Sequence, residues 1–179
     1  MILILLADGF EEIEALMPLD ILRRAGLDVR TVGVKSKIAL GSHAIPVITD
    51  IAPDEVKMNE VKMVIFPGGM PGSLNLDSDP FTDRIIAAVK ENGGHIAAIC
   101  AAPLILGRRG LLEGKRAICY PGFEGELCGA EIAKEPVVTD GNITTAKGMG
   151  VALEFSKELV RIACGEKKAE EISAAIMEN

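Results

Sequence analysis

Short apolar segments alternate along this chain with segments of helical periodicity, and this alternation constrains the fold more than any other feature. The apolar runs occupy residues 1–7, 28–34, 62–67, 95–100, 116–120 and 142–146. Helical spacing is found over residues 11–25, 79–92, 102–109, 151–164 and 167–177. Several runs are apolar on both faces, as parallel strands covered by two helical layers are. The alternation therefore predicts an α/β sandwich with a doubly wound, mostly parallel sheet.

The composition is that of one globular domain, which we place at residues 1–179. Apolar residues make up 49% of the chain, enough for a sizeable core at this length. The net charge is −7 and no run of Lys and Arg exceeds a pair, so we expect no nucleic-acid or membrane partner. The apolar opening has no basic leader, soon meets Asp8 and is too short for a signal peptide, so we expect a cytoplasmic protein.

The turns that follow the predicted strands indicate where a site would lie. In sheets of this kind, ligands bind beyond the carboxyl ends of the strands. Four such turns occupy residues 8–12, 68–73, 100–103 and 120–124, and we expect them to lie together. The segment 36–58 predicts a small β-hairpin outside the main sheet.

Cys100 ends the apolar run HIAAIC and stands just before a helix that has Pro103 in its first turn. A strand-to-helix turn projects its side chain from the sheet edge, as a nucleophile elbow does, and the helix favours the thiolate. A buried structural cysteine is the alternative. Cys119, Cys128 and Cys164 have irregular spacing and no CxxC, which indicates free thiols rather than a disulfide framework or zinc site.

A histidine base for Cys100 is not expected in this chain. His95 begins the strand that Cys100 ends, so it lies on the order of 16 Å away, at the opposite edge of the sheet. His43 belongs to the hairpin segment, and nothing in the sequence places it near the cysteine. A Cys–His dyad within one chain is therefore not predicted.

An acidic residue on the first predicted helix is the alternative partner. One face of this helix carries Phe10, Glu14, Met17, Pro18 and Ile21. Burial on that apolar stripe would raise the pKa of Glu14 and keep the carboxyl protonated. An ordinary place at the edge of the stripe is the competing interpretation. Pro18 has no N–H for the Glu14 carbonyl, so we expect a kink, whereas Glu11 and Glu12 are expected to form a solvated first turn.

The glycine-rich turn PGGMPG, residues 67–72, follows a strand but matches neither GxGxxG nor GxxxxGK[ST]. Its glycines would let backbone amides approach a substrate oxyanion. An ordinary turn remains the alternative.

Four motifs, GFEEIE, FPGGMPG, AAICAAP and GMGVALEF, resemble in order and spacing the ThiJ/PfpI superfamily, in particular its DJ-one and YajL-like branch. The resemblance covers essentially the whole chain. It implies a flavodoxin-like three-layer sandwich, a homodimer, Cys100 as a reactive elbow cysteine and Glu14 as its protonated acid. It also implies that Gly69 and Ala101 donate backbone amides toward the sulfur.

Two positions depart from the pattern of the superfamily. Tyr120 stands where many members carry histidine, and Ala101 stands where the peptidase-like members carry histidine. The second departure argues against proteolysis, and the first argues against strong glyoxalase activity. Tyr120 remains a possible substrate contact, but with a pKa near 10 its hydroxyl is a poor base at neutral pH.

The residues and the resemblance together favour a cysteine-dependent enzyme without cofactor or metal, acting on a small reactive carbonyl or a glycated substrate. Cys100 would add to the carbonyl, Glu14 would move protons, and the amides of Gly69 and Ala101 would hold the oxyanion. The rival is a non-enzymatic oxidative-stress sensor or redox-regulated chaperone whose Cys100 oxidises to sulfinate. A role in thiazole monophosphate biosynthesis is a third reading, which no phosphate-binding feature supports.

Overall fold

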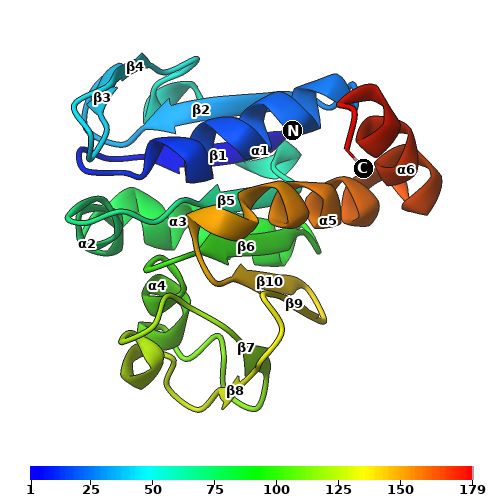
Figure 1. Cartoon of the computed structure of the whole chain (residues 1–179). Helices are drawn as coiled ribbons and strands as arrows, with labels where there is room; N and C mark the ends of the chain where they lie inside the picture. The colour runs from blue at the N-terminus through cyan, green and yellow to red at the C-terminus, as the bar shows by residue number, and fades with distance from the viewer. Residues whose placement is uncertain (179) are drawn as a thin grey trace.

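The computed structural model describes residues 1–178, in which a six-stranded sheet lies between two layers of helices (Figure 1). The elements are β1 (Ile2–Leu6), α1 (Glu12–Arg24), β2 (Val29–Gly33), β3 (Ile38–Leu40), β4 (Pro46–Ile48), β5 (Met63–Phe66), α2 (Gly72–Asp77), α3 (Pro80–Glu91), β6 (His95–Ile99), α4 (Pro103–Arg108), β7 (Arg116–Ala117), β8 (Glu131–Ile132), β9 (Val137–Asp140), β10 (Ile143–Ala146), α5 (Ala152–Cys164) and α6 (Glu166–Ala175). The sheet order is β2-β1-β5-β6-β10-β9. Only the edge strand β9 pairs antiparallel, so the predicted mostly parallel α/β sandwich is confirmed.

The sheet separates two apolar clusters because successive side chains of a strand point to opposite faces. In β1, Leu3 and Leu5 join the cluster shared with α3 and α4, whereas Ile4 and Leu6 join the cluster shared with α1 and α5. Each fully buried side chain of this size contributes about 1.5–3 kcal/mol to stability. Among residues 1–178, none of the helices combines the length and apolarity needed to span a bilayer.

The structure differs from the predicted elements mainly in the last third of the chain. The run 116–120 was expected as one strand, but only Arg116–Ala117 is a strand, and it pairs with β8 outside the main sheet. The reason is that Ile118 donates its amide to the Thr145 hydroxyl, so the backbone leaves a regular ladder. The edge strand β9 and the short helix α2 were not predicted. The hairpin of segment 36–58 is confirmed as the antiparallel pair β3 and β4.

Candidate active site

The four turns predicted to form a site meet at the carboxyl edge of the sheet. The Glu11 amide donates to the Gly68 carbonyl at 2.9 Å, which joins the first turn to the glycine turn. The Tyr120 amide donates to the Cys100 carbonyl at 2.7 Å, which joins the fourth turn to the third. The predicted clustering is therefore confirmed.

Cys100 lies in the sharp turn between β6 and α4 and has a left-handed backbone with φ of 65°. Such a conformation costs a residue with a side chain about 1–3 kcal/mol and persists only where the surroundings hold it. Here the Cys100 amide donates to the Ala146 carbonyl at 2.9 Å, and the Cys100 carbonyl accepts from Tyr120. The half-buried thiol is thus held at an elbow beyond the sheet.

Glu14 is completely buried on α1, beside the glycine turn and Cys100. Its Oε2 accepts from the Gly68 amide at 2.9 Å. Its Oε1 is buried without a well-formed hydrogen bond among the described residues. Burial raises the pKa of Glu14 to about 7, although the Cys100 thiol and the amides of Gly68 and Met149 act in the other direction. Glu14 is therefore poised between its two protonation states near neutral pH.

The thiol of Cys100 responds to the same burial. Burial raises its pKa to about 12, and the charge and hydrogen bond of Glu14 add to the rise, while the amides of Gly69 and Ala101 lower it. The Ala101 amide, in the turn into α4, acts in the direction expected for a helix start, but desolvation and Glu14 outweigh it. Cys100 and Glu14 therefore carry at most one negative charge between them at neutral pH, and it lies on Glu14.

The glycine turn approaches both groups so closely that side chains are excluded. A Cβ at Gly68 would lie 2.5 Å from Glu14 Oε2 and 2.6 Å from Cys100 Cβ. Gly69 has φ of 87°, and a Cβ there would lie 2.4 Å from the Glu11 amide nitrogen. The glycines thus bring backbone amides to the carboxyl group and the sulfur.

Tyr120 lies at the mouth of this site. Its side chain is 51% exposed and packs over Gly148, where a Cβ would lie 3.3 Å from Tyr120 Cδ2 and 4.0 Å from Glu14 Oε1. An adjoining cavity of about 340 Å³ is lined mainly by apolar groups and includes Tyr120, Met149 and Val151, with Lys147 also on its wall. Neither Glu14 nor Cys100 lines this cavity, and Gly148 separates it from the Glu14 carboxyl group.

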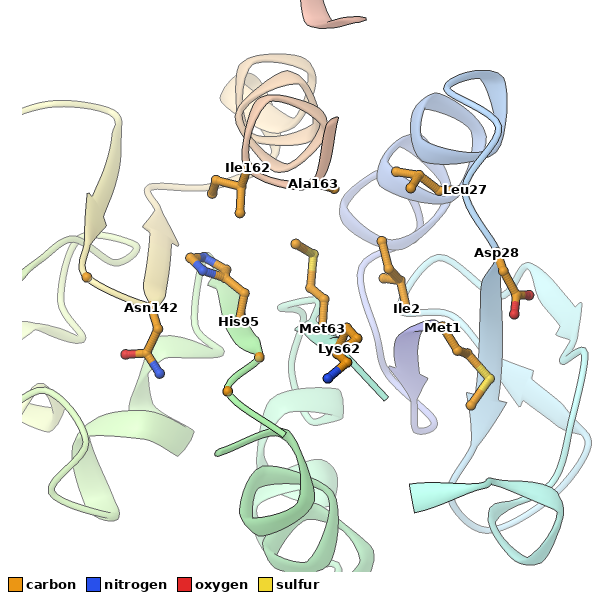
Figure 2. A pocket seen from close by; sticks show the side chains of 13 residues that line it. Met1, Ile2, Leu27, Asp28, Lys62, Met63, His95, Asn142, Ile162 and Ala163 are labelled. Carbon is orange, nitrogen blue, oxygen red and sulfur yellow. The ribbon is translucent and has the colours of Figure 1, made fainter. Parts of the chain in front are cut away.

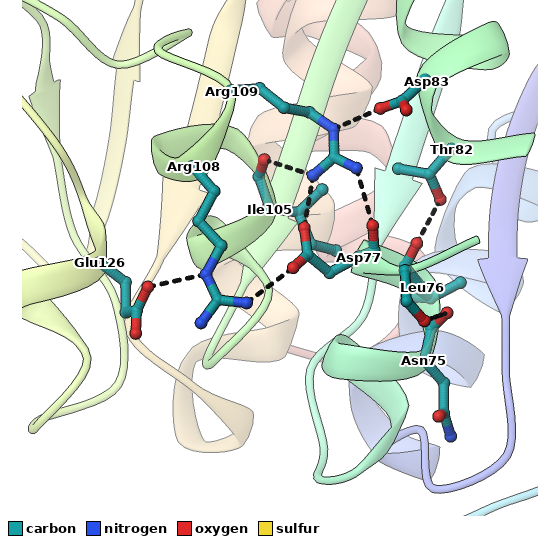
Figure 3. A network of polar contacts seen from close by, with 10 residues as sticks. Asn75, Leu76, Asp77, Thr82, Asp83, Ile105, Arg108, Arg109 and Glu126 are labelled. Carbon is teal, nitrogen blue, oxygen red and sulfur yellow. Dashed lines mark hydrogen bonds and ion pairs between the residues drawn. The ribbon is translucent and has the colours of Figure 1, made fainter. Parts of the chain in front are cut away.

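An ion-pair network that was not predicted joins the helices following the glycine turn and the elbow, α2 and α4 (Figure 3). Arg109 donates to the carboxylates of Asp77 and Asp83, and Arg108 donates to Asp77 at 2.7 Å and to Glu126 at 2.8 Å. The sequence showed only an Arg pair, whose partners lie 18 to 32 residues away along the chain. The network ties the glycine turn to the elbow from outside the site.

The prediction that Glu12 lies in a solvated turn is wrong. The residue is 3% exposed and accepts from the backbone and the ring Nδ1 of His43, at 2.7 and 2.8 Å. Although burial raises the pKa of Glu12, the hydrogen bonds from His43 lower it to about 2. Glu11 adds a carboxylate within 4.8 Å, but both oxygens of Glu12 already accept hydrogen bonds, so we assign no metal to this group. His43 thus fixes the hairpin to α1.

A strained elbow cysteine, a buried carboxyl group and a glycine turn on a flavodoxin-like sheet define a class of α/β proteins built around one elbow cysteine. The sequence profile of the DJ-1/PfpI family matches residues 1–162. The chain belongs to this family.

Relatives and solved structures agree with that assignment. The chain is 36% identical over 98% of its length to Protein DJ-1 homolog B of Arabidopsis thaliana, although it spans only 41% of that protein. It is 30% identical to a deglycase of Pyrococcus abyssi, covering 90% of this chain and 98% of the relative. It is 31% identical to a glutathione-independent glyoxalase of Caenorhabditis elegans, with 93% and 90% covered.

Two solved structures superpose closely on the fold. A mutant DJ-1 superfamily protein of Salmonella typhimurium gives a TM-score of 0.92 at 33% identity, with 99% of this chain and 98% of that chain covered. Oxidized DJ-1 of Toxoplasma gondii gives 0.93 at 31% identity, with 98% and 97% covered.

Proposed function

We propose that this protein is a cysteine-dependent, cofactor-free enzyme that acts on small reactive carbonyls or glycated adducts. The observation that carries the proposal is the buried Glu14 carboxyl group beside the Cys100 thiol. A base with a pKa of about 7 suits proton transfer at neutral pH. The deglycase and glyoxalase names of two relatives support the same substrate class.

The proposed first step forms a hemithioacetal. The Cys100 sulfur adds to the carbonyl carbon while Glu14 takes the thiol proton. The carbonyl electron pair moves to oxygen, where the amides of Gly69 and Ala101 stabilise the oxyanion, and Glu14 returns the proton to it. With an α-dicarbonyl such as methylglyoxal, a proton passes from the carbinol carbon to the neighbouring carbonyl oxygen and gives an enediol. The carbinol hydroxyl then loses its proton while the neighbouring carbon gains one, which gives the thioester of a 2-hydroxy acid. Water then releases a 2-hydroxy acid and the free thiol.

The test is a steady-state assay with methylglyoxal on the wild type and three variants. We expect Cys100→Ser to lose turnover entirely and Glu14→Gln to lose at least about a hundredfold, the usual contribution of a positioned acid–base group. Cys119→Ser, a buried thiol outside the elbow, is the matched control and should retain activity. Turnover that survives in Cys100→Ser would refute the proposal.

A second candidate function is oxidation sensing, favoured by the orphan oxygen of Glu14 beside the thiol. Two equivalents of peroxide would convert the thiol through sulfenic to sulfinic acid, each releasing one water. A protonated Glu14 would then donate to a sulfinate oxygen. A wild type inactive toward methylglyoxal but forming Cys100 sulfinate selectively would favour this function.

A further inference from the structure

A second cavity lies at the opposite edge of the sheet from Cys100, where the strands begin (Figure 2). Its volume is about 430 Å³, within the range of small-molecule sites. The inner wall is apolar and is built by Ile2, Leu27, Met63 and Ile162. His95 lies at the start of β6, beneath Ile162, and its imidazole ring contributes nitrogen atoms to the wall.

A chain of hydrogen bonds behind the cavity fixes the tautomer of His95. Glu158 is held ionised by Arg161, and a carboxylate only accepts, so the Thr139 hydroxyl donates to it at 2.6 Å. With its proton used, Thr139 accepts from Thr144 at 2.8 Å. Thr144 in turn must accept from His95 Nε2 at 2.8 Å. Neutral His95 therefore carries its proton on Nε2 and leaves a lone pair on Nδ1.

That lone pair is available to a ligand. Among residues 1–178, Nδ1 has no hydrogen-bond partner. The polar side-chain atoms that are both unpartnered and fully buried are Glu14 Oε1 and Ser73 Oγ, so Nδ1 of His95 is not fully buried. The ring is 7% exposed, and burial lowers the pKa of His95 to about 4, so the ring is neutral at physiological pH. A neutral imidazole with Nδ1 open accepts a hydrogen bond and donates none there.

The rest of the cavity also favours a hydrogen-bond donor. The helices α1 and α5 both end at this edge, and helix C-termini carry partial negative charge. The cationic side chain of the wall, Lys62, already donates to the Asn92 carbonyl at 3.0 Å. Asp28, the acidic side chain of the wall, accepts from Arg30 at 3.0 Å. Asn142, the neutral polar side chain of the wall, offers both a donor and an acceptor. The space therefore suits a largely apolar, uncharged body with a donor directed at His95.

We propose that this cavity is a second binding site, for a small fused-ring or similar apolar compound whose one N–H or O–H group donates to Nδ1 of His95. The site is independent of the chemistry at Cys100, because the two lie at opposite ends of β6. Occupation would bring the ends of α1 and α5 and the start of the sheet into contact with one molecule.

Indole and benzofuran form a matched pair of probes, since they share size and shape and only indole carries a donor. A neutral hydrogen bond contributes about 1 kcal/mol, so indole should bind about fivefold more tightly. Only two histidines are present, so nitrogen NMR of the imidazole rings reads His95 directly. We expect an unprotonated Nδ1 in the free protein, and indole alone should shift that signal.

Two variants test whether the preference for indole arises at His95 in the cavity. His95→Phe keeps a ring and removes the acceptor, so it should bind both probes equally. His43→Gln, at the exposed histidine of the hairpin, should keep the preference for indole. Equal affinities of the wild type for the two probes, a proton on Nδ1, or failure of both to bind would overturn the proposal. The proposal would also be overturned if indole released a second copy of the chain from this face, because that copy would then be the occupant of the cavity.

Discussion

Replacing Glu14 with Gln should stabilise the protein above neutral pH, even though it removes a group that we place in the reaction. The pKa of Glu14 is raised from 4.5 to about 7 by burial. At pH 4 the group is protonated whether the chain is folded or unfolded. Between pH 4.5 and 7 only the unfolded chain ionises, so the free energy of unfolding falls as the pH rises.

The size of this effect follows from the shift. Each unit of pKa corresponds to about 1.4 kcal/mol, so the wild type loses about 3 kcal/mol by pH 8 through this one group. Gln keeps the oxygen that accepts from Gly68 and cannot ionise. The difference in stability between Glu14→Gln and the wild type should therefore shift by about 3 kcal/mol in favour of the variant between pH 4 and pH 8.

Urea unfolding at the two pH values measures this shift, and any constant change in packing cancels in the comparison. The upper value stays below pH 9, so ionisation of Cys100 does not contribute. Glu12→Gln is the matched control with the opposite sign. Because the pKa of Glu12 is lowered, the wild-type carboxylate stabilises the fold at pH 8, and the substitution should destabilise it there. A stability difference for Glu14→Gln that does not change with pH would refute the burial argument.

Three further outcomes are expected. A thiol with a pKa of about 12 should react slowly by itself, but Glu14 is proposed to take its proton, so limited iodoacetamide labelling with peptide mapping should modify Cys100 ahead of the exposed Cys128 and Cys164. The reverse order would refute that proton transfer. Arg109→Met should lower the free energy of unfolding by about 1–2 kcal/mol, because the hydrogen bonds of Arg109 to Asp77 and to the Ile105 carbonyl are lost while Asp77 keeps its bond from Arg108. An unchanged urea midpoint would show that Arg109 contributes nothing. Sedimentation at micromolar concentration should give a homodimer, and a species of 18.9 kDa would contradict it.

The sheet could be predicted because its central strands are recognisable from their apolar residues alone. Both faces of β1, β5 and β6 are buried, so their apolar runs stand out from the periodic helices. The run 116–120 has the same apolar character but its amides bond a threonine side chain and the elbow carbonyl. Such tertiary bonding leaves no mark on local composition, so the sequence could not separate this run from a sheet strand.

The sequence predicted which residues meet at the candidate site better than it predicted their pKa values. Glu14 was expected to be buried from the spacing of its apolar neighbours, and the structure confirms the burial. Glu12 was misjudged because its partner, His43, lies about thirty residues away in a hairpin whose position the sequence does not give. The raised pKa of Cys100 was not predicted, because the helix end is visible in the sequence whereas the desolvation of the thiol by packed turns is not.

Two residues of the site lower the stability of the fold, and this bears on what the site is for. Cys100 holds a left-handed backbone at about 1–3 kcal/mol, and ionising Glu14 in place costs about 3 kcal/mol at pH 8. Gly at position 100 would adopt the turn without strain. Gln at position 14 would still accept from the Gly68 amide and would carry no ionisable group. Folding alone therefore requires neither the thiol nor the carboxyl group, whereas the proposed proton transfer between Cys100 and Glu14 requires both.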